Sequence, residues 1–393
     1  MRKLKTGKWL ATILARVVVC GIGLSFSACG EDDTLEGGGT TAEPYKIQTV
    51  EDFKKISMWD NATEKKYFVL TNNIDFSGED VKTLSAFYGE LDGQNYSIYN
   101  FESNAGTGLI HENFGTIKNL KIAGTNLDTY TIYTSTNPAS LQEAYVGGLA
   151  DINSGAIINC GAHNVKVSLS SAKEMETGKT MSVYAGGLVG RSSGIMRYCY
   201  AKKCTVSAKG DIALSGGSDG KCAIRAGGML GGTTNSATVE YCYGYGNNVE
   251  TFSRGGKTWS FTKADLWSYA GGLLGDNSST KTKYLFAYDC EAKALYEEAG
   301  KSKANVYYSA GEVMGASYVD CEYIYSLESE KQNVVGSSAN ALGGTVKKIG
   351  ALSVLLEDTD MKPSVTEWII DDTNQISFKE FLYAPLIENQ PIE

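Results

Sequence analysis

The sequence predicts an all-β protein built as a parallel β-helix, a solenoid in which short strands stack in successive coils. A motif centred on Gly-Gly recurs about every forty residues through the middle of the chain. Between these motifs, apolar and polar residues alternate over short segments such as 165–169, which is the periodicity of a strand. The composition agrees, because 45 Gly against 5 Pro in 393 residues indicates many tight turns.

The repeat marks fall at steps of 39, 39, 41, 44 and 40 residues: Gly108, Gly147, Gly186, Gly227, Gly271 and Gly311. A unit of this size cannot bury its own apolar face, so it has to stack on its neighbours, with one coil or two per unit. A propeller has repeats of similar length, but its four-stranded blades need hairpin turns that are not evident here. We expect the residues after the glycine pairs to form one buried column: Leu149, Leu188, Met229 and Leu273.

Residues 1–28 have the features of a secretory signal, with a basic start, an apolar run over 17–24 and small residues before Cys29. The segment before Cys29 resembles a bacterial lipobox, with Phe26 in place of the usual Leu. This resemblance implies cleavage before Cys29 and lipidation of that residue. The alternative is ordinary secretion, with Cys29 as a plain cysteine.

Residues 29–44 form a predicted flexible tether that includes three consecutive glycines at 37–39. Its acidic run at 31–33 is similar to the export signal of Gram-negative lipoproteins that reach the outer face of the cell. A solvated acidic tether is the alternative. We therefore expect a lipid anchor in the outer membrane, with the protein facing the exterior.

A solenoid needs caps, because its two ends expose unpaired strand edges. Thr49 is a predicted N-cap, followed by acidic residues in the first turn of a short helix over 50–59. We assign residues 45–105 to this N-terminal cap and the first coil, 106–335 to the repeats, and 336–393 to a C-terminal cap.

The repeats resemble the GLUG repeat of bacterial surface proteins over nearly all of residues 45–390. The copies of Gly-Leu-x-Gly lie at 187–190 and 272–275, with Met in place of Leu at 228–231. A second mark follows at 158–160, 198–200 and 241–243, as Ile-Asn-Cys or Tyr-Cys-Tyr. The resemblance implies a right-handed β-helix in a surface or adhesin-like protein and implies no activity. The pattern departs at Asp151, which replaces the last Gly, and at Glu312.

The seven cysteines other than Cys20 and Cys29 are an odd number, so they do not form a complete disulfide framework. Four of them occupy equivalent repeat positions and should point inward as one column: Cys160, Cys199, Cys242 and Cys321. A disulfide that joins Cys204 to Cys199 or to Cys222 is the alternative.

No sequence motif indicates a catalytic site. The G-x-S-x-G match at 216–220 has no His after it, since His111 and His163 both precede it. The segment that starts at His111 begins like H-E-x-x-H, but Gly115 stands where the second ligand belongs. With only 2 His in the chain, we expect no metal site and no cofactor.

Two sets of residues, both containing aromatic side chains, are the candidate ligand-binding sites. Inward cysteines would leave four tyrosines pointing outward by strand alternation: Tyr198, Tyr200, Tyr241 and Tyr243. An aromatic ladder that only stabilises the sheet is the alternative. The variable loop 250–268 contributes the second set: Arg254, Lys257, Trp259 and Trp267. The alternative there is that both Trp side chains pack the loop onto the solenoid.

These features predict a cell-surface lipoprotein that acts as a non-catalytic module for adhesion or for binding a glycan or a host or cell-surface protein. The net charge of −9 argues against nucleic acid as a partner. A polysaccharide-degrading β-helix enzyme, a lyase or hydrolase, is the first alternative. A purely structural envelope component is the second.

Overall fold

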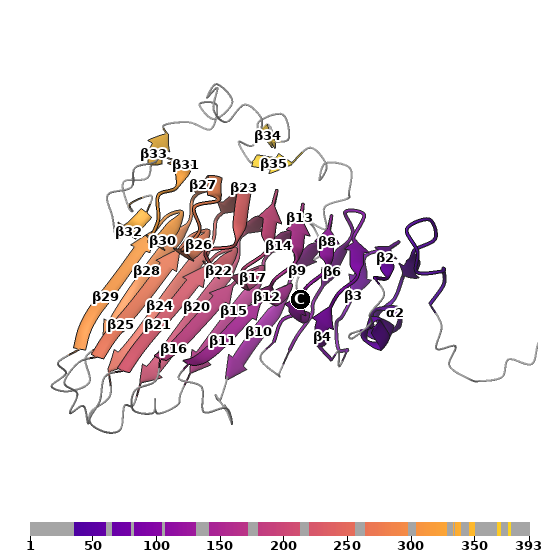
Figure 1. The fold of residues 1–393 in the computed structure, drawn as a ribbon, viewed down its shortest axis with the longest axis horizontal. Helices are drawn as coiled ribbons and strands as arrows, with labels where there is room; N and C mark the ends of the chain where they lie inside the picture. The colour runs from indigo at the N-terminus through magenta and orange to yellow at the C-terminus, as the bar shows by residue number, and fades with distance from the viewer. Residues whose placement is uncertain are drawn as a thin grey trace, which may run out of the picture. The chain divides into compact units, whose positions relative to one another are not determined.

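The computed structural model describes residues 35–59, 65–79, 82–103, 107–130, 141–171, 180–212, 220–255, 264–297, 304–327, 333, 335–338, 346–349, 368–370 and 376–378. These residues form a parallel β-solenoid with one short α-helix, as the sequence predicts (Figure 1). Within them, no helix has the length and apolar character needed to cross a membrane.

Short strands of one sheet form two sides of each coil. The first side holds β1 (Tyr45–Ile47), β2 (Tyr67–Leu70), β5 (Glu90–Asp92), β8 (Thr116–Lys118), β13 (Ala156–Ile158) and β18 (Ile195–Arg197). The second side holds β3 (Ile74–Asp75), β6 (Ser97–Tyr99), β9 (Lys121–Ala123), β14 (Gly161–His163) and β19 (Tyr200–Lys202). The two sides merge on longer strands: β23 (Thr238–Tyr245), β27 (Thr282–Tyr288), β31 (Glu322–Leu327) and β33 (Val346–Ile349).

A second sheet of short strands forms the third side. Its strands are β4 (Leu84–Phe87), β7 (Ile110–Asn113), β12 (Ala150–Asn153), β17 (Val189–Ser192), β22 (Leu230–Thr233), β26 (Leu274–Asn277), β30 (Met314–Ser317) and β32 (Val335–Ser338). Because all neighbours in this sheet are parallel, equivalent residues of successive coils lie side by side.

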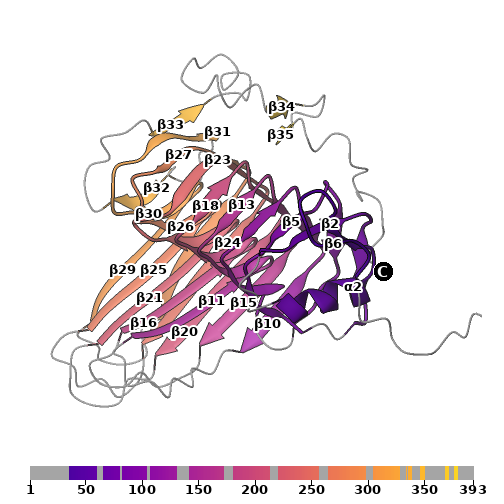
Figure 2. The same ribbon diagram turned by 45° about the vertical axis from the view of Figure 1, so that its right-hand side comes forward.

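Two sheets of longer strands widen the coil from residue 126 onward (Figure 2). The first contains β10 (Asn126–Tyr130), β15 (Lys166–Ser171), β20 (Thr205–Ile212), β24 (Asn248–Gly255) and β28 (Glu291–Glu297). The second contains β11 (Leu141–Gly147), β16 (Thr180–Gly186), β21 (Gly220–Gly227), β25 (Ala264–Gly271) and β29 (Ala304–Gly311). The two sheets pack on each other, and the buried Ser268 hydroxyl donates to Thr251 Oγ1 at 2.8 Å.

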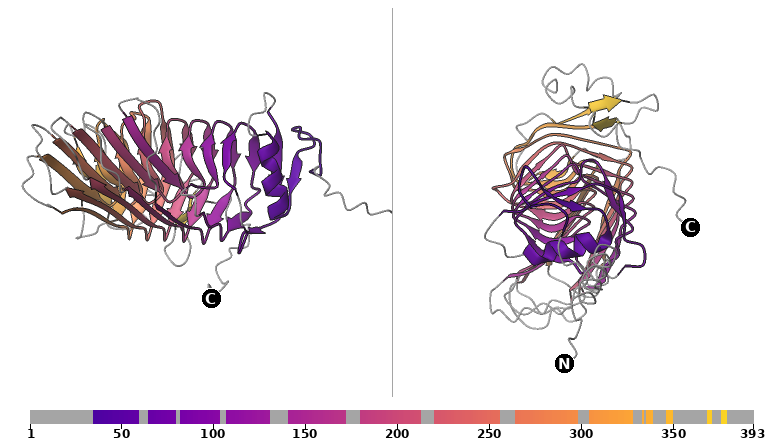
Figure 3. Two further views of the ribbon diagram at one scale, coloured as in Figure 1. Left: turned by 90° about the horizontal axis from the view of Figure 1, so that it is seen from below. Right: turned by 90° about the vertical axis from the view of Figure 1, so that its right-hand side faces the viewer.

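Each forty-residue repeat makes one coil (Figure 3). The glycine marks lie side by side in the strand register: Gly147, Gly186, Gly227, Gly271 and Gly311. The predicted apolar column is confirmed, because Leu149, Leu188, Met229 and Leu273 are fully buried and joined by N–H···O bonds of 2.9 to 3.0 Å. The repeat in the sequence is therefore the physical period of the solenoid.

The N-terminal cap begins as expected at Thr49. Its Oγ1 accepts from the Asp52 amide at 3.2 Å, and Asp52 Oδ2 accepts from the Thr49 amide at 3.1 Å. The α-helix α2 (Val50–Lys55) is shorter than the predicted 50–59, because the chain tightens into the 3₁₀ turn η1 (Ile56–Trp59). Residues 45–105 already contain β2 and β5, which pair with each other, so this stretch holds more than one coil.

The C-terminal cap assigned to 336–393 lies mostly outside the described residues. Within it, β34 (Trp368–Ile370) and β35 (Ile376–Phe378) pair antiparallel. The signal segment 1–28 and the lipidation site Cys29 also lie outside the described residues.

All seven cysteines of the solenoid are buried and free, so neither disulfide alternative is present. Cys160, Cys199 and Cys242 form the expected inward column, in register with Leu285 of the next coil. The prediction that Cys321 joins this column is wrong. Glu322 pairs with Lys283, which places Cys321 level with Thr282 instead.

We predict that these thiols are unreactive in the native protein. Burial raises the pKa of the Cys204, Cys222 and Cys290 thiols to about 12. The thiolate is the reactive form, so a thiol reagent such as Ellman's reagent at pH 8 should label none of the seven in the native protein. All seven should react once guanidinium chloride unfolds the chain. Rapid native labelling of the seven would contradict the inward columns.

Candidate functional site

Two of the predicted tyrosines, Tyr198 and Tyr241, line one corner of the solenoid together with Tyr284 and Tyr323. Their rings stack from coil to coil with centroids 5.2, 4.7 and 4.7 Å apart. All four have a φ of 55 to 59°, the left-handed conformation that turns the strand outward at this corner. Because each ring face covers the next, this arrangement matches the stabilising ladder more closely than a platform for sugar rings.

The expected exposure of the other two tyrosines is wrong. Tyr200 and Tyr243 are only 6% and 3% exposed. Their rings stack at 5.3 Å, and Tyr200 lies over Gly161, where a Cβ would collide with it. Strand alternation from an inward cysteine predicts which way the neighbouring side chain points. Packing against the adjacent coils decides how much of that side chain is exposed.

The predicted loop site is described only in part. Trp267 lies half-buried on β25 and stacks on Tyr307 of the next coil at 6.1 Å between centroids. Arg254 belongs to β24 by its backbone. Lys257 and Trp259 lie outside the described residues, so their role stays a prediction.

His111 and Asp151 form a polar pair where the wide coils begin. The fully buried Asp151 accepts from the Gly108 amide at 2.8 Å and the Gly147 amide at 3.2 Å through Oδ1. Its Oδ2 is 3.0 Å from Nδ1 of the half-exposed His111. The departure of Asp151 from the repeat pattern therefore has a structural purpose, because its carboxylate supplies acceptors to two backbone amides.

A more open polar site lies at the corner that joins the β16–β21 sheet to the β17–β22–β26 sheet. On one side of the corner, Tyr184 and Arg225 occupy adjacent coils. On the other side, Arg191, Gly232 and Asp276 follow one another from coil to coil. The tight Gly-Gly turn between the two strands brings these two rows face to face.

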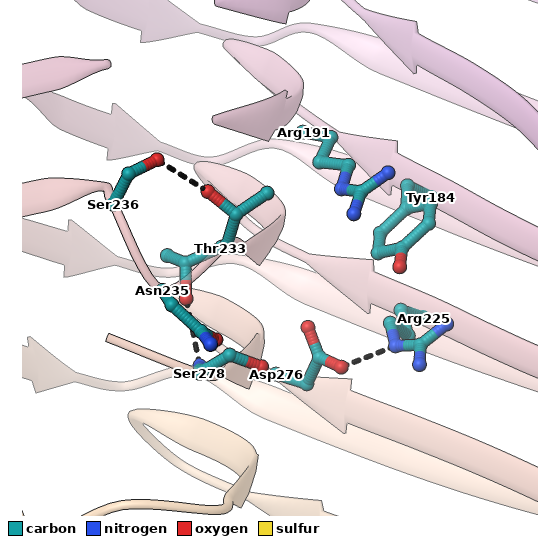
Figure 4. A pocket seen from close by; sticks show the side chains of 9 residues that line it. Tyr184, Arg191, Arg225, Thr233, Asn235, Ser236, Asp276 and Ser278 are labelled. Carbon is teal, nitrogen blue, oxygen red and sulfur yellow. Dashed lines mark hydrogen bonds and ion pairs between the residues drawn. The ribbon is translucent and has the colours of Figure 1, made fainter. Parts of the chain in front are cut away.

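Four of these residues, all but Gly232, line an open pocket of about 440 Å³, which lies in the usual size range of ligand sites (Figure 4). Tyr184, Arg191, Arg225 and Asp276 form one part of its wall. The rim is a polar turn made of Thr233, Thr234, Asn235, Ser236 and Ser278. The turn is held in shape by the Ser278 amide, which donates to Thr233 Oγ1 at 2.8 Å. We call this the corner pocket.

Two arginine–carboxylate pairs set the electrostatics of the corner pocket. The Arg225 Nε donates to Asp276 Oδ2, and Arg191 Nη1 donates to Glu143 Oε1 at 3.0 Å. The Tyr184 ring lies between the two guanidinium groups, 5.1 Å from Arg191 Cζ and 4.6 Å from Arg225 Cζ. Burial raises the pKa of the Asp276 carboxyl, and the Arg225 charge offsets only part of that rise.

Three buried polar atoms at the corner pocket have no hydrogen-bond partner among the described residues. They are Arg191 Nε, Arg225 Nη1 and Asp276 Oδ1. Leaving such groups unpaired costs about 1–3 kcal/mol each. Each of these three atoms has essentially no accessible surface, so they lie beneath the pocket wall rather than facing its open space.

None of the candidate site residues predicted from the sequence lines the corner pocket, although the sequence contains one signal of it. The residue two places before the glycine pair is Tyr145, Tyr184, Arg225 and Tyr269 in successive coils. Arg225 breaks that series. Its partner Asp276 lies 51 residues further along the chain, however, so the sequence does not show that the two side chains meet. Among the described residues, no group of three or more His, Cys, Asp or Glu side chains is placed to hold a metal ion.

The two histidines should titrate on opposite sides of the ordinary value of 6.5. The hydrogen bond to Asp151 raises the pKa of His111. Burial and then the nearby Lys202, Lys203 and Lys121 charges lower the pKa of His163 to about 4. His163 should therefore favour the fold above pH 6.5 and lose that contribution as pH falls toward 4, whereas His111 favours the fold at low pH until pH rises through its own pKa. Histidine NMR shifts of the wild type and His163→Gln measure both values, and a single shared midpoint would contradict this assignment.

Removing one partner of the buried Arg225–Asp276 pair should be far more damaging than breaking an exposed pair. Asp276→Ala leaves the Arg225 charge buried without its carboxylate, which we expect to cost about 3–5 kcal/mol of unfolding free energy. Glu79→Ala is the control, because both members of its pair with Lys54 are exposed, at 38% and 36%; we expect at most about 1 kcal/mol there. Denaturant titration measures the free energy of unfolding of both variants. Equal losses would show that the buried pair stabilises the fold no more than the exposed pair does.

Comparison with known proteins gives little further information. No protein-family model matches the chain, and no curated protein matches it. One solved structure that matches, titled a "putative immunoglobulin A1 protease" from Bacteroides ovatus, is 15% identical, with a TM-score of 0.41 over 87% of this chain and 94% of the other.

Proposed function

We propose that this protein is a lipid-anchored, cell-surface binding module without catalytic activity, and that the corner pocket is its ligand site. The observation that carries the proposal is an open pocket of about 440 Å³ whose wall holds Tyr184 between two arginines and whose rim is a polar turn. A concave site with an aromatic ring and a few convergent polar groups is the usual form of a ligand-binding site. The anchor at Cys29 and the exterior location rest on the sequence alone.

The polysaccharide-degrading alternative is less well supported by the same site. Glycoside hydrolysis generally needs two carboxyl groups that act as acid and as base or nucleophile. The two carboxylates at this corner, Glu143 and Asp276, are both paired with arginine. Each of the two is therefore already bonded to a guanidinium, which leaves neither placed as the free acid or base that hydrolysis needs.

The binding function is tested with glycan and host-protein arrays probed with the purified protein. Arg191→Ala should weaken binding about tenfold or more, because it removes a guanidinium from the pocket wall and one side of the Tyr184 stack. Arg197→Ala is the matched control, since it removes an arginine from a different side of the solenoid. Equal binding by the wild type and Arg191→Ala would contradict the proposed site.

The same arrays test the predicted loop site. If Trp259→Ala with Trp267→Ala abolishes binding while Arg191→Ala does not, the ligand site belongs to the 250–268 loop. Product analysis is run alongside on the polysaccharides that bind. Release of oligosaccharides would replace the binding proposal with the enzyme alternative.

A further inference from the structure

A row of side chains runs along the solenoid axis at the corner where the strands of the third side end. Because β4, β7, β12, β17, β22 and β26 are in register, the first residues after them occupy equivalent places in successive coils. Two of these residues are aromatic and the next four carry small hydroxyl side chains. We call them the corner row: Tyr88, Phe114, Ser154, Ser193, Thr234 and Ser278.

The aromatic end of the corner row presents a ring face. The rings of Tyr88 and Phe114 are nearly parallel, at 5°, with centroids 4.8 Å apart. This separation matches the spacing of about 4.8 Å between coils, so the two rings stack along the axis. The other face of Phe114 therefore points toward the next coil, where Ser154 is too small to cover a ring. Phe114 is accordingly 42% exposed.

Hydrogen-bonding groups lie next to that ring face. The exposed Ser154 hydroxyl donates to Glu112 Oε1 at 3.0 Å, and the Ser193 hydroxyl lies 3.4 Å from Ser154 Oγ. A hydroxyl donates one hydrogen bond and accepts two, so both serines can also bond to a ligand. A molecule stacked on Phe114 thus lies beside two hydroxyls and a carboxylate.

The corner row continues into the corner pocket. Its last two members, Thr234 and Ser278, belong to the pocket rim, where Figure 4 shows Ser278 together with Ser236. The Ser236 hydroxyl donates to the Ser193 carbonyl oxygen at 3.0 Å, which ties the rim turn to the preceding coil. Four coil steps of about 4.8 Å each separate Phe114 from Ser278. A single ligand that uses both ends must therefore be extended.

The chemistry of the corner row favours a saccharide over a peptide. A sugar ring has an apolar C–H face that packs on an aromatic ring, and hydroxyl groups around its edge, and a saccharide chain repeats both. An extended peptide binds by adding a strand to an exposed sheet edge. Here the Ser154 and Ser193 amides already donate to the carbonyl oxygens of Asn113 and Asn153, both at 2.8 Å. The backbone at this corner is therefore committed to bonds between coils.

We propose that an extended saccharide chain binds along the corner row, with one sugar ring stacked on Phe114 and further sugars reaching the corner pocket. The stacked sugar continues the column that Tyr88 and Phe114 begin, in the space that the small Ser154 side chain leaves open. This inference rests on the binding function proposed above, and it adds the class of ligand and the direction in which the ligand lies.

The test is calorimetric titration of the full chain with mannohexaose, cellohexaose and chitohexaose, and with the disaccharide of each. At least one hexaose should bind. Its disaccharide should bind about tenfold more weakly or worse, because it is too short to contact both Phe114 and the pocket rim. Phe114→Ala should weaken the hexaose about tenfold or more, since it removes the stacking face. Phe114→Tyr should restore most of the binding, because Tyr88 already occupies the equivalent place in the preceding coil.

Ser154→Leu tests the same place by filling it. Its larger side chain should cover the Phe114 face and weaken the hexaose about tenfold or more, although the exposed turn tolerates the change. Ser57→Leu is the matched control, because it makes the same change at an exposed hydroxyl of the N-terminal cap. Tyr308→Ala is the control for Phe114→Ala, because it removes an aromatic ring that is 61% exposed on β29.

Thermal melts establish that each variant is folded, and Ser154→Leu carries the test if Phe114→Ala is not. Hexaose binding that neither variant weakens, or equal affinity for a hexaose and its disaccharide, would overturn the inference. Failure of all three hexaoses to bind would also overturn it. If an array ligand still binds in an Arg191-dependent way, the binding function at the corner pocket stands without the extended chain. If no array ligand binds either, both proposals fall.

Discussion

In-register hydrogen bonding from coil to coil is the constraint on which the rest of the structure depends. Parallel strands lie about 4.8 Å apart, so every side chain has its own equivalents from the adjacent coils as nearest neighbours. The buried Leu149, Leu188 and Met229 show the result for apolar residues. At the corner next to them, a Cβ on Gly186 would collide with the carbonyl oxygen of Val189, so the turn requires glycine. In-register hydrogen bonding between coils therefore accounts for both the buried leucine column and the glycine motif of the repeat.

The same rule explains how polar residues are tolerated inside. The Asn113 amide donates to Asn153 Oδ1 at 2.8 Å, and the Asn153 amide donates to Ser192 Oγ at 3.1 Å. In later coils Asn277 donates to Ser317 Oγ at 3.2 Å. These buried ladders are paired from coil to coil, which is the usual condition for polar groups in a core. The exceptions among the described residues include three side-chain atoms at the corner pocket: Arg191 Nε, Arg225 Nη1 and Asp276 Oδ1.

The aromatic residues divide into structural and accessible groups for the same reason. Stacking on the next coil uses both faces of an inner ring in a ladder, as for Tyr241 between Tyr198 and Tyr284. Such rings stabilise a strained left-handed corner and leave mainly their edges to solvent. At the corner pocket, Tyr184 lies instead between arginines, because Arg225 interrupts the tyrosine series there. The corner pocket thus lies where a column changes residue type.

The sequence by itself determined the solenoid, the Leu column and the cap at Thr49, because these depend on spacing along the chain and on local backbone hydrogen bonds. It also indicated that the cysteines do not form a disulfide framework. Tertiary structure alone decided that Tyr200 and Tyr243 are covered, that Cys321 leaves the cysteine column, and that Arg225 meets Asp276. These outcomes depend on loop lengths that set the register between coils, and on side chains some forty to fifty residues apart that only stacking brings together.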